Sequence, residues 1–508
     1  MIPVYSVAQI RAVEAQENSK RGETSLMKQA ASHLASTALG MLAENTSAEP
    51  AFVVALIGPG NNGGDGLYAL AELQLQKIST LALQFHEQVH AEAAAAYQAA
   101  GGTMLDLSDG EGELAKASLI IDAIYGLGYR PGSALPVLPA NARVLACDVP
   151  SGLNPDTGVA EDGVLLAERT LTFGALKSGL LAIDGPLVTG DITVADLEFD
   201  FSSVEAGTQL VEETATRELL NQHRSWRDAG RHKYQRGVLG LIAGSDLYPG
   251  AAQLTAKAAV ACGAGLLRTH VPESIQSMMA LSVPESVPLD DDQIKEALSS
   301  SRRQIHGKGA KIKAWAIGPG LDGRTPPTGA IADVFASPQP AVIDASGLEV
   351  VPAGPSEQPR VLTPHAKELR MLLSRAGVKI TPDEIAQDPI RWTRWAALAY
   401  NAVVLLKGPT SYIVAPNGDS LMVSHSAPEL ATAGSGDVLT GILGYMLSDS
   451  SLTGTEGLRT VPNRRMMELT ACAAYIHGHL GRVTAADGTV NASRLIENLP
   501  KVMKQFGF

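Results

Sequence analysis

The sequence predicts an α/β protein made of two layered domains. Short apolar runs, such as 52–57 and 403–406, end in glycine-rich turns and alternate with segments of helical periodicity. Apolar runs of this length are typical of strands that are buried on both faces of a parallel sheet. The chain has 508 residues, which provides for roughly two to four domains with cores of their own.

The composition argues against several classes of function. Hydrophobic residues make up 45% of the chain and charged residues 18%, a balance typical of globular proteins. The formal net charge of -13 and the lack of a basic stripe argue against a nucleic-acid partner. Because no apolar run could span a bilayer and the N-terminus lacks a signal-peptide pattern, we expect no membrane association.

The cysteines give no indication of a metal site. Cys147, Cys262 and Cys472 are far apart in the sequence and lack a metal-binding spacing. We expect them to be buried thiols in a reducing compartment, with the cytoplasm as the location.

The first half begins with a segment predicted to be helical over 6–44, with Ser6 as its N-cap. A strand over 52–57 then enters the glycine-rich turn 58–66, and a helix is predicted over 67–77. A strand, a glycine-rich turn and a helix in this order form the usual phosphate-binding geometry of a doubly wound fold. The spacing matches neither the dinucleotide fingerprint nor a P-loop, so a tight turn without a ligand is the alternative.

Two further strands, 119–125 and 144–148, end in similar turns. Ligands bind at the carboxyl ends of strands in open α/β sheets, so polar residues at these ends should converge on one crevice. Their oxygen atoms suit an alkali or alkaline-earth cation better than zinc. The alternative is that each Asp only caps its turn. The residues are Asn62, Asp122, Asp148 and Ser151.

The second half repeats the alternation of short strands and helices, which favours an αβα layer fold. Between the halves, 200–222 shows no strong strand pattern and is predicted to be a linker. The strands expected in the second half are 237–243, 265–267, 314–317, 341–344, 360–362 and 403–406.

The most informative stretch of the second half is the Gly-Ser-Gly turn 434–436, followed by a helix that begins near Asp437. The free backbone N–H groups of a helix start form an anion site. Asp437 is placed to take a proton from a hydroxyl group beside a bound phosphate. The alternative is an ordinary helix with a glycine-rich entry and an Asp cap.

The first half resembles the NAD(P)H-hydrate epimerase domain over residues 1–215, on the motifs 61–66, 122–123 and 148–152. The resemblance implies a Rossmann-like αβα domain that inverts a hydrated carbon on the reduced nicotinamide ring, with Asp148 as the best-placed acid–base group. It implies a potassium ion bound by Asn62, Asp122 and Ser151. It also implies a set of residues that bind the hydrated nucleotide: Asn61, Asn62, Gly63, Gly64, Asp65, Gly126, Leu127, Gly128, Tyr129, Arg130, Pro131, Gly132 and Asp148.

The second half resembles the ribokinase-like superfamily over residues 222–508, and within it the NAD(P)H-hydrate dehydratases. The motifs are 248–251, 263–266, 318–321, 363–365 and 434–437. The resemblance implies a ribokinase-like αβα domain that binds the hydrated nucleotide through Ala251, Ala252, Gly320, His365 and Asp437. It assigns the phosphate donor to Lys407, Gly408, Pro409, Thr410, Ser411 and Gly436. Without its motif, His365 would be interpreted as a structural histidine.

The implied reaction is the repair of hydrated NADH and NADPH. The first domain interconverts the R and S hydrates, and the second dehydrates the S hydrate. Asp437 would deprotonate the ring hydroxyl, which attacks the donor's terminal phosphate, and the 434–436 amides would hold the developing charge. Magnesium is expected as a charge neutraliser. ADP is expected as the donor, because the fused arrangement resembles bacterial members of the family.

Three departures from the family pattern bear on metal or donor contacts: Ala366-Lys367, Ser346 and Asp322. Two other functions are compatible with parts of the sequence. A vitamin or sugar kinase could share the second fold, but the attached first domain argues against it. A non-catalytic nucleotide-binding regulator is disfavoured by Asp437 between intact glycines. We expect small-molecule partners only, and a homo-oligomer whose size the sequence does not indicate.

Overall fold

The computed structural model describes residues 1–44, 50–223, 233–299, 312–324, 326–424, 427–453 and 464–508. The chain forms two compact units, Ile2–Gly207 and Thr208–Phe508, here called the first unit and the second unit. They divide before the boundary expected at 215–222.

The boundary between the units falls within the linker expected over 200–222, but much of that segment is structured. Strand β10 (Thr208–Leu210) and helix α8 (Glu213–His223) occupy much of this segment and belong to the second unit. β10 pairs with strand β19 (Ser420–Ser424), and Leu220 of α8 is fully buried in the core of the unit. A strand as short as β10 leaves little trace in the sequence because its burial depends on a partner far away in the chain.

The helical segment predicted over 6–44 consists of two helices, preceded by strand β1 (Ile2–Tyr5). Helix α1 (Val7–Arg21) is capped by Ser6, whose hydroxyl accepts a hydrogen bond of 3.3 Å from the backbone N–H of Gln9, which confirms the predicted cap. Gly22, with a φ of 84°, separates α1 from α2 (Glu23–Ala43). Glycine adopts this conformation without the steric cost that other residues meet.

The sheet of the first unit has the strand order β4-β3-β2-β5-β6-β7-β9, and all neighbouring pairs are parallel. The order reverses at β2, which lies between β3 and β5. Ligand crevices form at such reversals, beyond the carboxyl ends of the strands. The strands are β2 (Phe52–Ile57), β3 (Ser79–Gln84), β4 (Thr103–Asp106), β5 (Leu119–Ala123), β6 (Val144–Cys147), β7 (Arg169–Phe173) and β9 (Asp191–Ala195), and β8 (Leu176–Lys177) pairs with β1.

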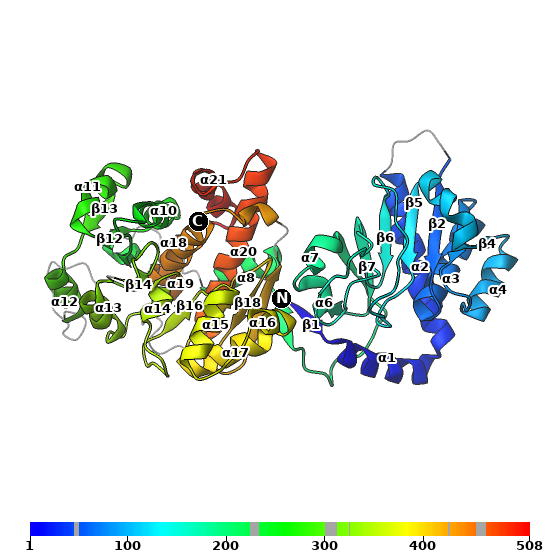
Figure 1. Ribbon diagram of the computed structural model, residues 1–508, viewed down its shortest axis with the longest axis horizontal. Coiled ribbons are helices and arrows are strands. Elements are labelled where there is room, and N and C mark those ends of the chain that lie inside the picture. The colour runs from blue at the N-terminus through cyan, green and yellow to red at the C-terminus, as the bar shows by residue number, and fades with distance from the viewer. Residues whose placement is uncertain (45–49, 224–232, 300–311, 325, 425–426, 454–463) are drawn as a thin grey trace. The chain divides into compact units, whose positions relative to one another are not determined.

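Long helices cover one face of this sheet (Figure 1). Helices α2, α3 (Asn61–Leu75) and α4 (Ala91–Ala99) contribute to a core that includes Val53 of β2. The next residue, Val54, points to the other face, because side chains alternate along a strand, and joins a second cluster of apolar residues. The shorter helices of the unit are α5 (Leu107–Gly110), η1 (Glu111–Lys116), α6 (Ser178–Leu181) and α7 (Gly185–Val188).

Helix α3 begins at Asn61 and not at the predicted Leu67, so the glycine-rich segment is the first turn of a helix. The reason is close packing against the end of β2. A Cβ atom on Gly63 would lie 2.2 Å from the carbonyl oxygen of Gly58, and one on Gly64 would lie 2.6 Å from the sulfur of Met27. The glycines therefore let the helix start, with its free N–H groups, approach the carboxyl end of the strand.

The sheet of the second unit has the strand order β13-β12-β11-β14-β15-β16-β17-β18-β19-β10. It is parallel from β13 to β17 and antiparallel from β17 through β19, and the order reverses at β11. The strands not yet given are β11 (Val238–Ile242), β12 (Leu266–His270), β13 (Ser286–Pro288), β14 (Ala314–Ile317), β15 (Ala341–Ile343), β16 (Arg360–Leu362), β17 (Val403–Leu406) and β18 (Thr410–Val414).

Helices lie on both faces of this sheet, which confirms the predicted αβα architecture (Figure 1). One layer contains α10 (Pro249–Ala261), α18 (Ser435–Ser448), α20 (Arg464–Ala486) and α21 (Ala492–Gln505), which contact one another. The other helices are α9 (Lys233–Arg236), α11 (Glu273–Ser282), α12 (Asp291–Ser299), α13 (Thr328–Phe335), α14 (Gly347–Val350), α15 (Ala366–Arg375), α16 (Pro382–Gln387), α17 (Pro389–Tyr400), η3 (Pro428–Leu430) and α19 (Ser450–Thr453). Within the described ranges, no helix combines the length and the apolar character needed to cross a bilayer.

Candidate active sites

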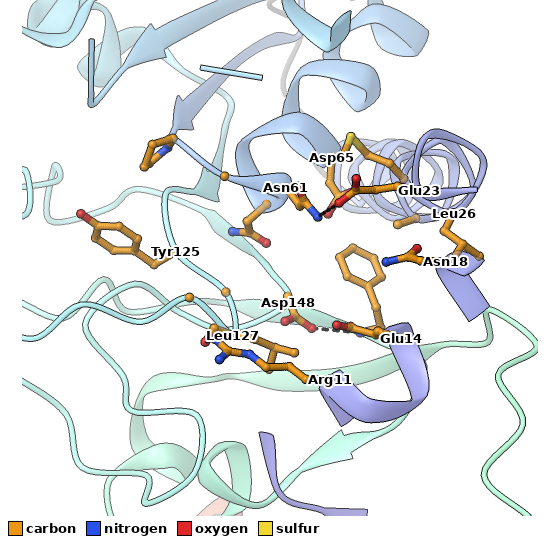
Figure 2. Close-up of a pocket in the computed structure, with 18 of the residues that line it drawn as sticks. Arg11, Glu14, Asn18, Glu23, Leu26, Asn61, Asp65, Tyr125, Leu127 and Asp148 are labelled. Carbon is orange, nitrogen blue, oxygen red and sulfur yellow. Dashed lines mark hydrogen bonds between the residues drawn. The ribbon is translucent and has the colours of Figure 1, made fainter. Parts of the chain in front are cut away.

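A cavity of about 460 Å³ lies in the first unit where the strand order reverses between β2 and β5 (Figure 2). Its walls come from the turns that follow these two strands and from helices α1 and α2. The sequence therefore placed this crevice correctly. The predicted binding residues that line it are Asn61, Asn62, Asp65, Gly126, Leu127, Gly128, Arg130 and Asp148.

Asp148 is the most constrained carboxylate of the cavity. Its Oδ1 atom accepts hydrogen bonds from Lys177 Nζ at 2.5 Å, from the Thr172 hydroxyl at 3.1 Å and from the backbone N–H of Phe173 at 3.2 Å. Lys177 is fully buried, and Asp148 has a φ of 69°. These three donors fix the position of the Asp148 carboxyl group. Its Oδ2 atom lies beside Gly126 in the cavity wall, because a Cβ atom on that glycine would be 3.1 Å away.

Two other carboxyl groups share the cavity with Asp148. Burial and the negative charge of Asp148 raise the pKa of Glu14 to about 7, against the opposing charges of Lys177 and Arg11. Burial, Asp148 and Glu14 raise the pKa of Asp65 well above its usual value. The cavity therefore combines one carboxylate stabilised by a lysine with two carboxyl groups that retain protons more readily.

The remaining predicted residues of the first unit do not line the cavity. Gly63 and Gly64 are helix residues whose lack of a side chain permits close packing. Tyr129 donates a hydrogen bond of 2.8 Å to Glu161, and the backbone N–H of Gly132 donates to the same carboxylate at 2.9 Å. Pro131 is exposed. The loop 129–132 is thus tied to Glu161, with Arg130 as its contribution to the cavity.

The three predicted potassium ligands are only partly brought together. Asp122 and Ser151 are fully buried and in direct contact, since the Ser151 hydroxyl donates to Asp122 Oδ1 at 2.6 Å and its N–H to Oδ2 at 2.7 Å. Asn62 lies in the cavity wall, with its Oδ1 atom beside Gly126. Burial raises the pKa of Asp122 to about 6, although hydrogen bonds from Ser151 and Ile124 oppose this. The Nδ2 atom of Asn62 is a buried donor that has no hydrogen-bond partner among the described residues.

In the second unit, the helix start predicted near Asp437 is confirmed: α18 begins at Ser435, after Gly434 with a φ of 85°. A Cβ atom on Gly436 would lie 3.8 Å from both Lys407 Nζ and Asp344 Oδ2. The first turn of α18 therefore faces a lysine and a carboxylate contributed by the ends of strands β17 and β15. Three segments far apart in the chain meet at this point.

Lys407 and Asp344 form a close ion pair, with Nζ and Oδ1 2.6 Å apart. The hydroxyls of Thr363 and Thr440 each donate to Asp344 at 2.8 Å. Burial alone would raise the pKa of Asp344, but the charge and hydrogen bond of Lys407 and the two hydroxyls lower it overall. Asp344 therefore holds Lys407 beside the first turn of α18.

The environment of Asp437 suits a general base. Burial and the negative charge of Asp344 raise its pKa to about 7, and Lys407 opposes the shift. A carboxylate with such a pKa accepts a proton at neutral pH more effectively than an unperturbed one. His477 forms a 3.1 Å hydrogen bond with the hydroxyl of Ser435, the first residue of α18. Burial lowers the pKa of His477 to about 4.

His365 is the N-cap of α15. Its Nδ1 atom accepts a hydrogen bond of 3.3 Å from the backbone N–H of Glu368, and the Glu368 carboxylate accepts one of 2.8 Å from the N–H of His365. Lys407 Nζ lies 4.0 Å from the same carboxylate. His365 therefore has a structural role as the N-cap of α15. Its contact with the hydrated nucleotide stays a prediction.

The predicted donor segment is partly a strand. Gly408 and Pro409 are exposed, whereas Thr410 and Ser411 are buried in β18. Strand β18 turns back to pair with β17 in an antiparallel register that extends to Leu406 and Tyr412. The contact of this segment with the phosphate donor stays a prediction.

A second cavity, of about 320 Å³, lies at the reversal of the second sheet, at the ends of β11, β12 and β14. Gly320, with a φ of 66°, borders this region: a Cβ atom on it would lie 2.8 Å from Cβ of Ala251 and 2.5 Å from the carbonyl oxygen of Tyr248. Ala251 and Gly320 are thus brought together. Ala252 is fully buried in the core of the unit.

Sequence reasoning missed four residues of these sites. Glu14 and Lys177 approach Asp148 from α1 and β8, and Asp344 and Glu368 flank Lys407. Asp344 gave a usable signal, since it ends a buried strand as Asp148 does. The position of Glu14 gave none. The three cysteines are buried and free, as predicted, and no cluster of three or more His, Cys, Asp or Glu side chains able to hold a metal occurs among the described residues.

Comparison with known proteins covers both halves of the chain. The family model described as NAD(P)H-hydrate dehydratase matches residues 239–501, and the model described as YjeF-related protein N-terminus matches residues 23–179. The bifunctional NAD(P)H-hydrate repair enzyme Nnr of Mycobacterium leprae is 32% identical, covering 97% of this chain and 98% of that protein. The protein of the same name from Moorella thermoacetica is 29% identical, covering 89% and 87% respectively.

Among solved structures, the ADP/ATP-dependent NAD(P)H-hydrate dehydratase from Bacillus subtilis is similar to part of the chain, with 28% identity and a TM-score of 0.48. The similarity covers 59% of this chain and 99% of that one. The relatives match the chain over both units, which the repair-enzyme interpretation predicts and a vitamin or sugar kinase does not. The chain belongs to the family of bifunctional NAD(P)H-hydrate repair enzymes.

Proposed function

We propose that this chain repairs hydrated NADH and NADPH, with the first unit interconverting the R and S hydrates and the second unit dehydrating the S hydrate at the expense of ADP. The observation that carries the proposal is the placement of Asp437 in the first turn of α18, directly after Gly436 and within electrostatic reach of Lys407 and Asp344. A base, an anion-binding helix start and a cation are the parts that phosphoryl transfer requires.

In the second unit, Asp437 takes the proton of the ring hydroxyl while the hydroxyl oxygen attacks the terminal phosphorus of the donor. The bond to the donor's bridging oxygen breaks, and the first-turn amides of α18 stabilise the developing charge. Lys407, held by Asp344, neutralises phosphate charge. Loss of the phosphate and of a proton from the adjacent carbon restores the double bond of the ring.

Magnesium fits the second site as a partner of the donor. Mg²⁺ is usually held by one or two carboxylates together with substrate phosphates and water, and not by a complete protein cage. Asp344, Asp437 and Glu368 surround Lys407 and could supply such carboxylates. When bound, the ion would neutralise charge on the transferred phosphoryl group.

A potassium ion in the first unit is supported by the chemistry of the buried pair Asp122 and Ser151. The Ser151 hydroxyl donates to Asp122 and accepts from the N–H of Tyr125 at 3.1 Å, so one lone pair remains for a cation. A cation would also offset the burial that raises the pKa of Asp122. Epimerisation should therefore be faster in potassium than in tetramethylammonium buffer. Equal rates would contradict the proposed potassium site.

The test uses the purified full-length protein with each pure hydrate. The R hydrate alone should yield a mixture of both epimers, and the S hydrate with ADP and Mg²⁺ should yield NADH or NADPH, both followed by chromatography. A higher rate of dehydration with ATP than with ADP would overturn the choice of donor. No dehydration with either nucleotide would overturn the function of the second unit.

Location and assembly remain predictions. Three free, buried thiols fit a reducing compartment such as the cytoplasm. The homo-oligomer can be tested by light scattering coupled to size-exclusion chromatography, where a mass of 53.1 kDa would correspond to a single chain and would contradict the prediction.

A further inference from the structure

We propose that Glu14 and Asp148 form the acid–base pair of the first unit, in which Glu14 protonates the departing hydroxyl and Asp148 accepts a proton from the incoming water. The inference rests on the proposed epimerisation and names the groups that carry it out. It assigns a catalytic role to α1, which the match to the YjeF-related model, residues 23–179, does not include.

The geometry places both carboxyl groups in one cavity. Glu14 comes from the middle of α1, and Asp148 from the end of β6, and both line the 460 Å³ space. Figure 2 shows the two carboxyl groups directed toward each other in the cavity. Since Lys177, Thr172 and Phe173 all donate to Oδ1 of Asp148, its Oδ2 atom is the one available to a ligand.

The charges around the pair favour opposite protonation states. Lys177 Nζ lies 2.5 Å from Asp148 Oδ1 and places a positive charge against that carboxyl group. Glu14 is half-buried and faces that negative charge, and its pKa rises to about 7 despite the charges of Lys177 and Arg11. Asp65, whose pKa is also raised, adds negative potential when ionised. The cavity therefore places a carboxyl group paired with a lysine beside one that retains its proton more readily.

The chemistry requires one group of each kind. The ring nitrogen donates electrons into the neighbouring double bond, so hydration leaves the hydroxyl on the carbon beside that nitrogen. When Glu14 gives its proton to this hydroxyl, the C–O bond breaks, water leaves and the nitrogen lone pair forms a C=N bond. Water then adds to the opposite face and gives a proton to Asp148. Transfer of that proton from Asp148 to the facing Glu14 restores both groups, so atoms and charges balance.

The experiment compares Glu14→Gln with Glu17→Gln in the full-length protein. Glu17 lies on the same helix, pairs with Lys20 at 2.7 Å and does not line the cavity. Each variant receives the pure R hydrate, and the rate of inversion is corrected for the spontaneous reaction. Glu14→Gln should lower turnover by about 10²–10⁴-fold, while Glu17→Gln should keep it.

The pH profile separates a catalytic from a structural role. A general acid must be protonated, so epimerisation by the unaltered protein should fall as pH rises through about 7, the pKa of Glu14. In Glu14→Gln the rate should no longer fall as pH rises through this value. Glu14→Asp keeps the carboxyl group one methylene further back, so it should be slower but should still show the fall. Hydrogen exchange of β5 to β7 in each variant reports on folding of the first unit, and dehydration of the S hydrate reports on the second unit.

Several outcomes would overturn the pairing. These are inversion by Glu14→Gln at the unaltered rate, an unchanged pH limb in that variant, or a loss in Asp65→Asn with none in Glu14→Gln. If Glu14→Gln does not fold, a Glu14→Asp protein without the alkaline fall in rate would contradict the proposal equally. Failure of the unaltered protein to invert either hydrate would instead overturn the proposed function of the first unit.

Discussion

The two units place charge differently around sheets of the same kind. In the first unit Glu14, Asp65 and Asp148 line the cavity at the reversal of strand order, and the fully buried Lys177 fixes Asp148. In the second unit the cavity at the reversal does not include Asp437, Lys407 or Asp344, which meet instead at the start of α18. An inversion needs only a substrate between acid and base, whereas phosphoryl transfer needs a second binding region for the donor.

The largest expected effect comes from Asp437→Asn. Asn fits the same space and leaves the first unit untouched, but it cannot take a proton. Dehydration of the S hydrate should fall by about 10²–10⁴-fold, while inversion of either hydrate should stay unchanged. Both reactions are measured on one sample by chromatography. Dehydration at the unaltered rate would show that another group is the base.

The next effect tests the buried pair of the first unit through stability. Lys177→Met leaves the negative charge of Asp148 buried without its partner, which typically costs about 3–5 kcal/mol. The double variant Lys177→Met with Asp148→Asn should regain much of that stability without regaining inversion.

Local unfolding in the first unit can be followed by hydrogen exchange of β5 to β7. The tryptophans all lie beyond residue 207, so their fluorescence in urea reports the second unit and serves as the control. An unchanged exchange rate in Lys177→Met, or a double variant no more stable than the single one, would contradict the pairing.

In the second unit, Lys407→Ala should raise the Michaelis constant for the donor more than that for the hydrated nucleotide. A charge-assisted hydrogen bond is worth about 1.5–3 kcal/mol, so the increase should be roughly 10–100-fold. Exposed Lys379 provides a matched substitution, Lys379→Ala. If the donor constant is the same in both variants, Lys407 does not contact the donor.

The pKa of Asp437, about 7, sets the pH dependence of dehydration. A base must be ionised, so the rate should fall as pH drops through that value, by about tenfold between pH 8 and pH 6. Epimerisation should show the opposite trend, because Glu14 must be protonated. The two profiles can be recorded with the same protein. Parallel profiles would mean that one shared group limits both reactions.

The smallest effect separates donor binding from helix stability. Gly436 and Gly329 both occupy the second position of a helix, α18 and α13, and neither has a Cβ clash. Alanine should therefore stabilise each helix by up to about 1 kcal/mol. Only Gly436→Ala should place a methyl group against the donor. Overpacking of about 1 kcal/mol would raise the Michaelis constant for the donor by about fivefold. Equal donor constants would place the phosphate elsewhere.

Much of this arrangement was accessible from the sequence because parallel strands collect their carboxyl ends at one edge. Asp148 follows directly from that rule, and the helix start near Asp437 follows from its Gly-Ser-Gly turn and the helical spacing after it. Glu14 could not be found, because nothing in α1 indicates that it packs beside the end of β6. The burial of Ser411 in β18 could not be predicted, because the antiparallel return of this strand depends on pairing with its neighbours. The substrate was predicted from the resemblance to the NAD(P)H-hydrate repair family, because no single motif identifies it.

The central claim is that each unit contains a complete active site, and a complementation experiment tests it most directly. Asp148→Asn and Asp437→Asn proteins are supplied, singly and as a mixture, with equal amounts of both hydrates, ADP and Mg²⁺. Asp148→Asn alone should consume the S hydrate and leave the R hydrate, apart from slow spontaneous inversion, and Asp437→Asn alone should consume neither. The mixture should convert both hydrates to NADH. If the mixture leaves the R hydrate behind, or if either folded variant alone has lost both reactions, the two sites are not independent.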